Sequence, residues 1–261
     1  MRLEGDCMLV VYSSKDPAGT AIANQLRKSG VNLDLLEIGS EIIHCDAEIK
    51  DVKADYIVFA SKHKSESEMP CLTVHTPGNW SVAEKGGKDR QVCIAAPSKM
   101  KTVAMNMARH VELPNLGWPV YMECTHHGPA TNVPCFFVEI GSSEKEWRNE
   151  LAAKIVADAI ISHTFKPYKW PVAMGVGGGH YCPAFTKYEL AGATETNAWA
   201  FSQVLPGYHV DSVDFDTFKQ GIERSSEKVE KVLLDWKGLK GAQRQKILEF
   251  IGRIGIGWDK T

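Results

Sequence analysis

Four histidines lie in three short turns, each of which follows an apolar run of the sequence. They are His75, His126, His127 and His180. Imidazole is the commonest protein ligand for metal ions, and it is the only side chain whose ordinary pKa lies near neutrality. If the turns meet in space, these histidines could hold a zinc ion, with His126 and His180 acting in general acid–base catalysis. A hydrogen-bonded structural role is the alternative for each of them.

His126 and His127 are adjacent, which limits what both can do in an extended chain. Successive side chains of a strand point to opposite faces, so we expect at most one of this pair to reach a site. Cys124 adds a soft ligand to the same turn. The turn lacks the paired spacing that is typical of a structural zinc site, so the sequence leaves the ligand set open.

Two glutamates lie within or at the end of strand-like runs and are further catalytic candidates. Glu123 and Glu139 could each orient a histidine or accept a proton. A position facing solvent is equally compatible with the pattern. The sequence contains no G-x-S-x-G motif, so it does not support a serine nucleophile of the Ser-His-Asp type.

Three glycines, Gly177, Gly178 and Gly179, directly precede His180. No Lys-Ser or Lys-Thr pair follows them, which excludes a P-loop. The dinucleotide-binding fingerprint fails as well, because His180 or Cys182 stands where it needs glycine or alanine. We predict that this loop lets a substrate approach closely and that its N–H groups donate to an oxyanion. An ordinary glycine-rich turn is the alternative.

The elements that must position these residues alternate between strands and helices. Short apolar runs at 8–13, 33–38, 56–60, 71–74, 119–124, 136–140, 172–176 and 198–205 predict strands. We therefore expect an α/β fold with a mixed, mostly parallel central sheet flanked by helices. We expect a single catalytic domain over residues 1–261, with a helical C-terminal segment from about 215 to 261. Sites in such sheets form where strands end and loops begin.

Composition excludes several classes of protein. The 261 residues are 44% hydrophobic and 24% charged, as in a globular protein with a substantial core. Thirty Lys and Arg against 32 Asp and Glu give a net charge of -2, so a DNA-packaging role is not expected. The seven cysteines form no C-x-x-C pair, which favours reduced thiols and a cytoplasmic location.

No membrane partner is expected either. The sequence has no long uninterrupted apolar stretch, and Glu4 and Asp6 precede an apolar run of only residues 7–12. This pattern does not match a signal peptide.

Three strings of residues, taken together, point to a known family. They are HTPGNW at 75–80, THHGP at 125–129 continuing into PCFFVEIGSS at 134–143, and GGGHYCPAFT at 177–186. Their sequence and order resemble the archaeal and plant type of D-aminoacyl-tRNA deacylase. The resemblance spans most of the chain, from its opening strand to its final helices.

The resemblance implies an enzyme that hydrolyses the ester between a D-amino acid and the 3′ end of tRNA. It also implies action on D-aminoacyl-tRNA whose amino group an aldehyde has modified. Such proteins are zinc-dependent monomers with a fold similar to nucleoside phosphorylases and peptidyl-tRNA hydrolases. The expected partner is the acceptor end of tRNA, and we expect Asn79 to bind substrate together with the three glycines.

Two alternatives from other classes remain. One is a small-molecule enzyme on the same architecture, either nucleoside phosphorylase-like or a metal-dependent hydrolase. The other is a non-catalytic RNA-binding module in which the histidines are structural. Steep salt dependence would favour tRNA over a small molecule, because Lys and Arg contacts with phosphates release counterions. Turnover of the ester would exclude the binding module.

Overall fold

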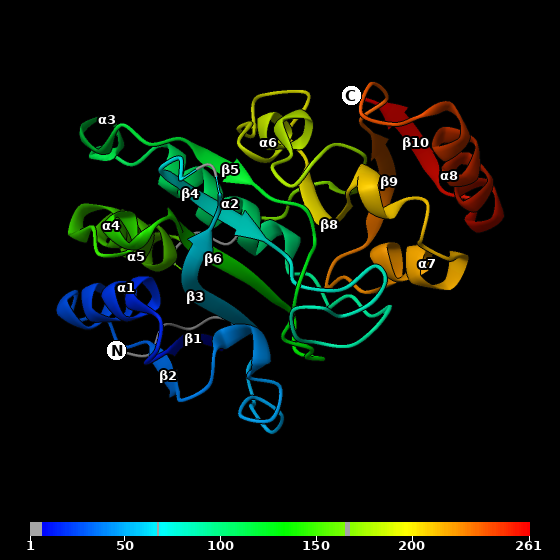
Figure 1. Ribbon diagram of the computed structural model, residues 1–261. Helices are drawn as coiled ribbons and strands as arrows, with labels where there is room; N and C mark the ends of the chain where they lie inside the picture. Colours follow the sequence, from blue (N-terminus) through cyan, green and yellow to red (C-terminus); the bar gives the residue numbers. More distant parts are fainter. Residues whose placement is uncertain (1–6, 67, 165–167) are drawn as a thin grey trace.

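A computed structural model describes residues 7–66, 68–164 and 168–261 (Figure 1). Glu4 and Asp6, which entered the signal-peptide argument, lie outside these residues. The first of two sheets comprises β1 (Met8–Ser13), β2 (Asp34–Ile38), β3 (Tyr56–Lys64), β4 (Cys71–His75), β5 (Val120–Met122) and β6 (Cys135–Ser142). Its strand order is β2-β1-β3-β6-β4-β5. Among these neighbouring strands, β4 and β6 are antiparallel and the other pairs are parallel.

The second sheet is parallel throughout its described strands. It comprises β7 (Val172–Val176), β8 (Ala200–Leu205), β9 (Val229–Leu234) and β10 (Gly257–Lys260), in the order β10-β9-β7-β8. The helices are α1 (Pro17–Lys28), α2 (Pro97–Ala108), α3 (Leu113–Leu116), α4 (Glu144–Trp147), α5 (Glu150–Thr164), α6 (Pro183–Glu189), α7 (Phe215–Glu223) and α8 (Gly241–Ile254), with short 3₁₀ turns at Ile42–His44 and Gly207–His209. The predicted mixed, mostly parallel α/β fold is confirmed.

The first sheet separates two apolar layers, because successive strand residues point to opposite faces. On one face, Val10 of β1 and Val58 of β3 pack in the same cluster as apolar residues of α1, α2 and α5. On the other face, Phe59 of β3 stacks on Phe137 of β6, with ring centroids 4.8 Å apart. Burial on both faces explains why these strands are continuous apolar runs.

The second apolar layer gives way to polar side chains further along β3. Phe59, Ser61 and His63 point to the same face by alternation, and Ser61 is aligned with Glu139 of β6. Thr73 of β4 is aligned with Glu139 on the other side. The sheet therefore carries a row of polar side chains where its apolar core ends.

The expectation of a helical segment from about 215 to 261 is wrong in part. α7 and α8 are helical, but β9 and β10 are strands of the second sheet. Charged neighbours such as Glu230 and Lys231 hide the short buried run Val232–Leu234 from a search for apolar periodicity. β10 is exposed along its whole length and carries no apolar pattern at all. None of the helices in the described ranges is both long and apolar enough to cross a membrane.

Candidate active site

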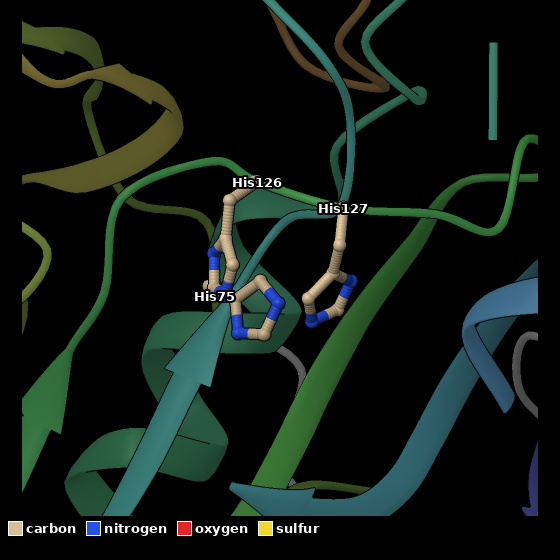
Figure 2. A group of neighbouring side chains, drawn as sticks. All are labelled: His75, His126 and His127. Carbon is tan, nitrogen blue, oxygen red and sulfur yellow. The ribbon is translucent and has the colours of Figure 1, made fainter. Parts of the chain in front are cut away.

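Three of the predicted histidines converge at the edge of the first sheet (Figure 2). His75 ends β4, and His126 and His127 lie in the turn after β5. The ring centroid of His75 lies 4.3 Å from that of His126 and 4.9 Å from that of His127. One ring nitrogen from each residue lies within 4.8 Å of the other two. We call these residues the three-histidine cluster.

Both members of the adjacent pair reach the cluster, so the expectation that only one would do so is wrong. His127 has φ 46°, in the left-handed region, and this turns the chain instead of extending it. The N–H of Gly78 donates to the carbonyl of His127 at 2.8 Å and fastens the turn to the segment after β4. The alternation rule applies to strands and fails at such a turn.

The hydrogen bonds of the cluster leave nitrogen lone pairs for a metal ion. Nδ1 of His126 lies 2.8 Å from the carbonyl oxygen of Cys124, and Nδ1 of His127 lies 2.6 Å from that of Gly128. An Nδ1–H that donates to a carbonyl places the lone pair on Nε2, as in many metal-binding histidines. His75 is completely buried, and neither of its ring nitrogens has a hydrogen-bond partner in the described residues.

The protonation state of the cluster fits the same role. Burial lowers the pKa of His75 well below its usual value, and the neighbouring histidines lower it further. Burial lowers the pKa of His126 in the same way, and that of His127 to about 4. At neutral pH all three imidazoles are therefore uncharged, which is the form that binds metal ions. The site thus contains residues that can hold a metal ion.

A charged network built on Glu123 lies beside the three-histidine cluster. Glu123 follows β5, and its carboxylate lies 2.9 Å from Nε2 of His180 and 3.1 Å from Nδ1 of His63. Burial raises the pKa of Glu123, but His180 and His63 outweigh burial and lower it to about 2. Burial also lowers the pKa of His180, whereas its contacts with Cys124 and Glu123 raise it to about 10. At neutral pH the pair is therefore ionised.

Glu139 connects the network to the cluster. Its Oε2 lies 3.7 Å from Nδ1 of His63 and 3.7 Å from Nδ1 of His75, and the hydroxyl of Ser61 donates to its Oε1. Burial raises the pKa of Glu139, although its contact with His63 opposes the rise. Both glutamates are buried, so the solvent-facing alternative is wrong for Glu123 and for Glu139.

A pocket of about 200 Å³ opens onto these groups. Among its lining residues are His63, His126, His127, His180, Ser61 and Glu139, together with Ile42, Ile43 and the lysines Lys15, Lys62, Lys64 and Lys85. Asp16 and Glu41 also line it, so the pocket combines proton-transfer groups with four lysines and two further acidic residues. A small polar group that carries a nearby negative charge would fit it chemically.

The four residues predicted to bind substrate do not line this pocket. The side-chain amide of Asn79 donates to the carbonyl oxygens of Gly86 and Lys88 and so holds the loop beside it. Gly177 donates its N–H to the carbonyl of Leu205, so this group is not available to an oxyanion. Gly177 and Gly178 have positive φ angles and lie against Asp235, and Gly179 is exposed. The glycines instead let the chain turn before His180.

Sequence reasoning missed His63, which contacts Glu123 and Glu139. Its other nitrogen, Nε2, lies 2.8 Å from the hydroxyl of Tyr181, the residue after His180. The missed signal is that Ser61 and His63 continue the alternation of the apolar run at 56–60. Sites in parallel sheets form at the carboxyl ends of strands, so the polar residues that follow this apolar run are candidates for the site.

Comparisons with known proteins identify the family of this chain. The fold and its buried histidine–glutamate centre define an α/β enzyme. A sequence model of the D-aminoacyl-tRNA deacylase family matches residues 50–259. The D-aminoacyl-tRNA deacylase of Pyrococcus furiosus is 41% identical over 87% of this chain and 83% of its own length. That of Methanocaldococcus jannaschii is 37% identical over 97% of this chain and 99% of its own.

The chain therefore belongs to the D-aminoacyl-tRNA deacylase family. A solved structure agrees with the fold. It is a crystal structure described as that of a conserved protein of unknown function, and it superposes with a TM-score of 0.88 at 28% identity. The match covers 98% of this chain and 95% of the other.

Proposed function

We propose that this protein hydrolyses the ester of D-aminoacyl-tRNA and releases the free D-amino acid and tRNA. The observation that carries the proposal is the pocket lined by His126, His127, His180 and Glu139, in a chain of this family. His180 comes from the loop after β7, whereas the other groups come from the first sheet. Because both sheets supply the site, we propose that residues 1–261 act as one catalytic domain. We also propose that the protein is a monomer, as the family resemblance implies, and that it is cytoplasmic, as the absence of a C-x-x-C pair among its cysteines favours.

We infer that the metal ion is zinc, held by His75, His126 and His127. Three neutral imidazoles with available lone pairs match the donor set of catalytic zinc sites. When bound, zinc would lower the pKa of water and polarise an ester carbonyl. His180 was also considered as a ligand, but its Nε2 lies 2.9 Å from Glu123, closer than the 3.6 Å of Nε2 of His126, so we assign it to proton transfer instead.

The remaining groups supply proton transfer and orientation. Glu139 lines the pocket and takes a proton from the water that attacks the ester carbonyl. His180 is held in its charged form by Glu123 and donates a proton to the departing ribose oxygen. His63 orients Glu123 and Glu139 from the other side. Lysines around the pocket attract the phosphates next to the ester.

The test is deacylation of matched D-tyrosyl-tRNA and L-tyrosyl-tRNA by the purified protein. We expect rapid loss of the D-ester, while the L-ester disappears at the rate seen without enzyme. Equal slow loss of both esters, with tRNA binding retained, would favour the RNA-binding module. Absence of both turnover and tRNA binding would favour the small-molecule enzyme.

A further inference from the structure

A second hollow borders the catalytic pocket and runs along the exposed side of α1. This hollow of about 440 Å³, which we call the α1 groove, lies between α1 and the segment that contains Arg148 and Glu150. Figure 1 shows α1 beside α4 and α5. Lys15 lines both the pocket and the groove, so the loop between β1 and α1 borders both hollows. A chain that leaves the pocket past Lys15 would enter the groove.

The groove presents mainly hydrogen-bond donors and positive charge. Lys15 and Lys28 lie at the two ends of the part of the chain that lines the groove along α1, and Thr20, Asn24 and Gln25 lie between them. Lys15 and Lys28 are exposed, and neither forms an ion pair with any residue in the described ranges. Charged and amide donors of this kind bind phosphate oxygens.

Acidic groups offset part of this charge. Arg148 lies across the groove and forms an exposed ion pair with Glu144 at 2.6 Å, and Glu150 is the acidic residue of the lining. The backbone N–H groups at the start of α1 do not contribute, because the side chain of Asp16 accepts those of Ala18 and Gly19. The lysines at the two ends therefore supply most of the attraction for an anion.

The length and position of the α1 groove favour a nucleic-acid phosphate backbone as its ligand. α1 has 12 residues and so extends about 18 Å, a span that covers several nucleotide phosphates. The ester under attack is on the terminal nucleotide of tRNA, and the next phosphates belong to the unpaired 3′ end. With the ester in the pocket, these phosphates must continue away from it along the surface of the protein.

We propose that the α1 groove binds the phosphate backbone of the unpaired 3′ end of tRNA while the D-aminoacyl ester occupies the catalytic pocket. The proposal rests on the proposed function. It assigns Lys28 to substrate binding at the far end of α1, and it assigns Lys15 to the loop that borders both hollows.

The experiment compares Lys28→Glu with a matched control, Lys53→Glu. Lys53 is also exposed but lies just before β3, whereas His63, which lines the catalytic pocket, lies near the other end of that strand. Both variants change the total charge of the protein equally, so a difference between their kinetics must come from where the charge lies. The substrates are D-tyrosyl-tRNA and 3′-D-tyrosyl-adenosine, the second of which has no phosphate to reach the groove.

We expect Lys28→Glu to lower the ratio of kcat/KM for the tRNA ester to kcat/KM for the adenosine ester by about five- to tenfold. Loss of one phosphate contact should also reduce the slope of log(kcat/KM) against log salt for the tRNA ester by about 0.7. Lys53→Glu should leave the ratio and the slope unchanged. An equal effect of the two variants, or no effect of Lys28→Glu, would overturn the proposal.

Binding of uncharged tRNA separates this proposal from the proposed function. Weaker binding by Lys28→Glu than by Lys53→Glu supports the groove even if neither ester is hydrolysed, in which case only the proposed function fails. Equal binding of uncharged tRNA by the two variants contradicts the groove even if the D-ester is hydrolysed normally.

Discussion

At the scale of single residues, the site divides into uncharged and charged histidines a few ångströms apart. Burial and mutual repulsion keep the three-histidine cluster neutral, whereas Glu123 keeps His180 protonated. The neutral group is suited to a metal ion and the charged group to proton donation. Under the proposed assignment, one residue type performs two tasks, and the environment of each ring decides which.

His75 provides the most direct test of the neutral group, since neither of its ring nitrogens has a hydrogen-bond partner among the described residues. We expect His75→Gln to lose the bound zinc and at least about a hundredfold in deacylation rate, because an amide is a poor zinc ligand. Zinc content by mass spectrometry and single-turnover rates would measure both. His110→Gln, which changes a histidine paired with Asp158 outside the pocket, is the control and should retain metal and rate.

Glu139 tests the proton-transfer group. Glu139→Gln keeps the shape of the side chain but removes the base, so kcat should fall about 10²- to 10⁴-fold. The zinc content should stay that of the wild type, because Glu139 is not among the proposed ligands. A variant with normal kcat would exclude Glu139 as the base. Loss of zinc in this variant would mean that Glu139 belongs to the metal site.

At the scale of elements, the pairing of β3 with β6 sets the positions of the charged groups. Ser61 is aligned with Glu139, so the strands bring these two side chains together, and His63 is aligned with Gly141. The indole N–H of Trp147 in α4 donates to the carbonyl of His63 at 2.9 Å and fixes the end of the strand. If His63 has the role we propose, a change on any of these elements should affect catalysis through it.

Gly141 provides such a test, because a Cβ there would lie 2.8 Å from Cδ2 of His63 and 3.1 Å from Sγ of Cys71. We expect Gly141→Ala to displace the imidazole and to lower kcat by about tenfold or more. The control is Gly252→Ala in α8, where a Cβ meets no atom within 4 Å. It should keep full activity and gain about 0.5 to 1 kcal/mol of stability from helix propensity. Equal activity of the two variants would contradict the role of His63.

The sequence predicted some of these elements and missed others for physical reasons. Apolar runs and the turns after them identified His75, His126, His127 and His180, because burial and turn formation leave local signals. The burial of Glu123 and Glu139 depends on which strands are neighbours, which no local pattern encodes. Asn79 and the glycines shared the turn signal, but their contacts hold loops in place.

At the scale of the whole molecule, the site lies at the junction of the two sheets. The N–H of Cys124 donates to the carbonyl of His180 at 2.9 Å, and the N–H of Cys182 donates to the carbonyl of Met122 at 3.1 Å. These bonds attach the loop after β7 to the segment after β5. These two segments lie more than fifty residues apart in the sequence, and only the tertiary structure brings them together. The sequence alone therefore suggested the candidate residues but did not show that they are neighbours.

A buried lysine joins two helices elsewhere in the molecule, and a buried glutamate coupled to it makes stability depend on pH. Lys101 of α2 donates to the carbonyl oxygens of Tyr188 and Glu189 in α6. Burial lowers the pKa of Lys101, and it raises the pKa of Glu189 from 4.5 to about 8. Between pH 4.5 and 8 the folded state therefore binds more protons at Glu189 than the unfolded state, so this group makes stability fall as pH rises.

Glu189→Gln should remove that component of the pH dependence. We expect the Tm of the wild type to fall more steeply between pH 5 and 8 than the Tm of this variant, as followed by circular dichroism. Glu249→Gln changes an exposed carboxylate of α8 and should behave like the wild type. Parallel Tm curves for wild type and Glu189→Gln would show that Glu189 does not take up a proton in this range.

We propose that the histidine–glutamate centre hydrolyses D-aminoacyl esters with the help of a zinc ion. The most direct measurement is the rate of D-tyrosyl-tRNA deacylation as zinc is added back to protein treated with a chelator. We predict negligible activity before addition and a rise that saturates once the three-histidine cluster is filled, with no recovery in His75→Gln. Full activity in protein shown to be free of metal, or equal recovery in His75→Gln, would contradict the account.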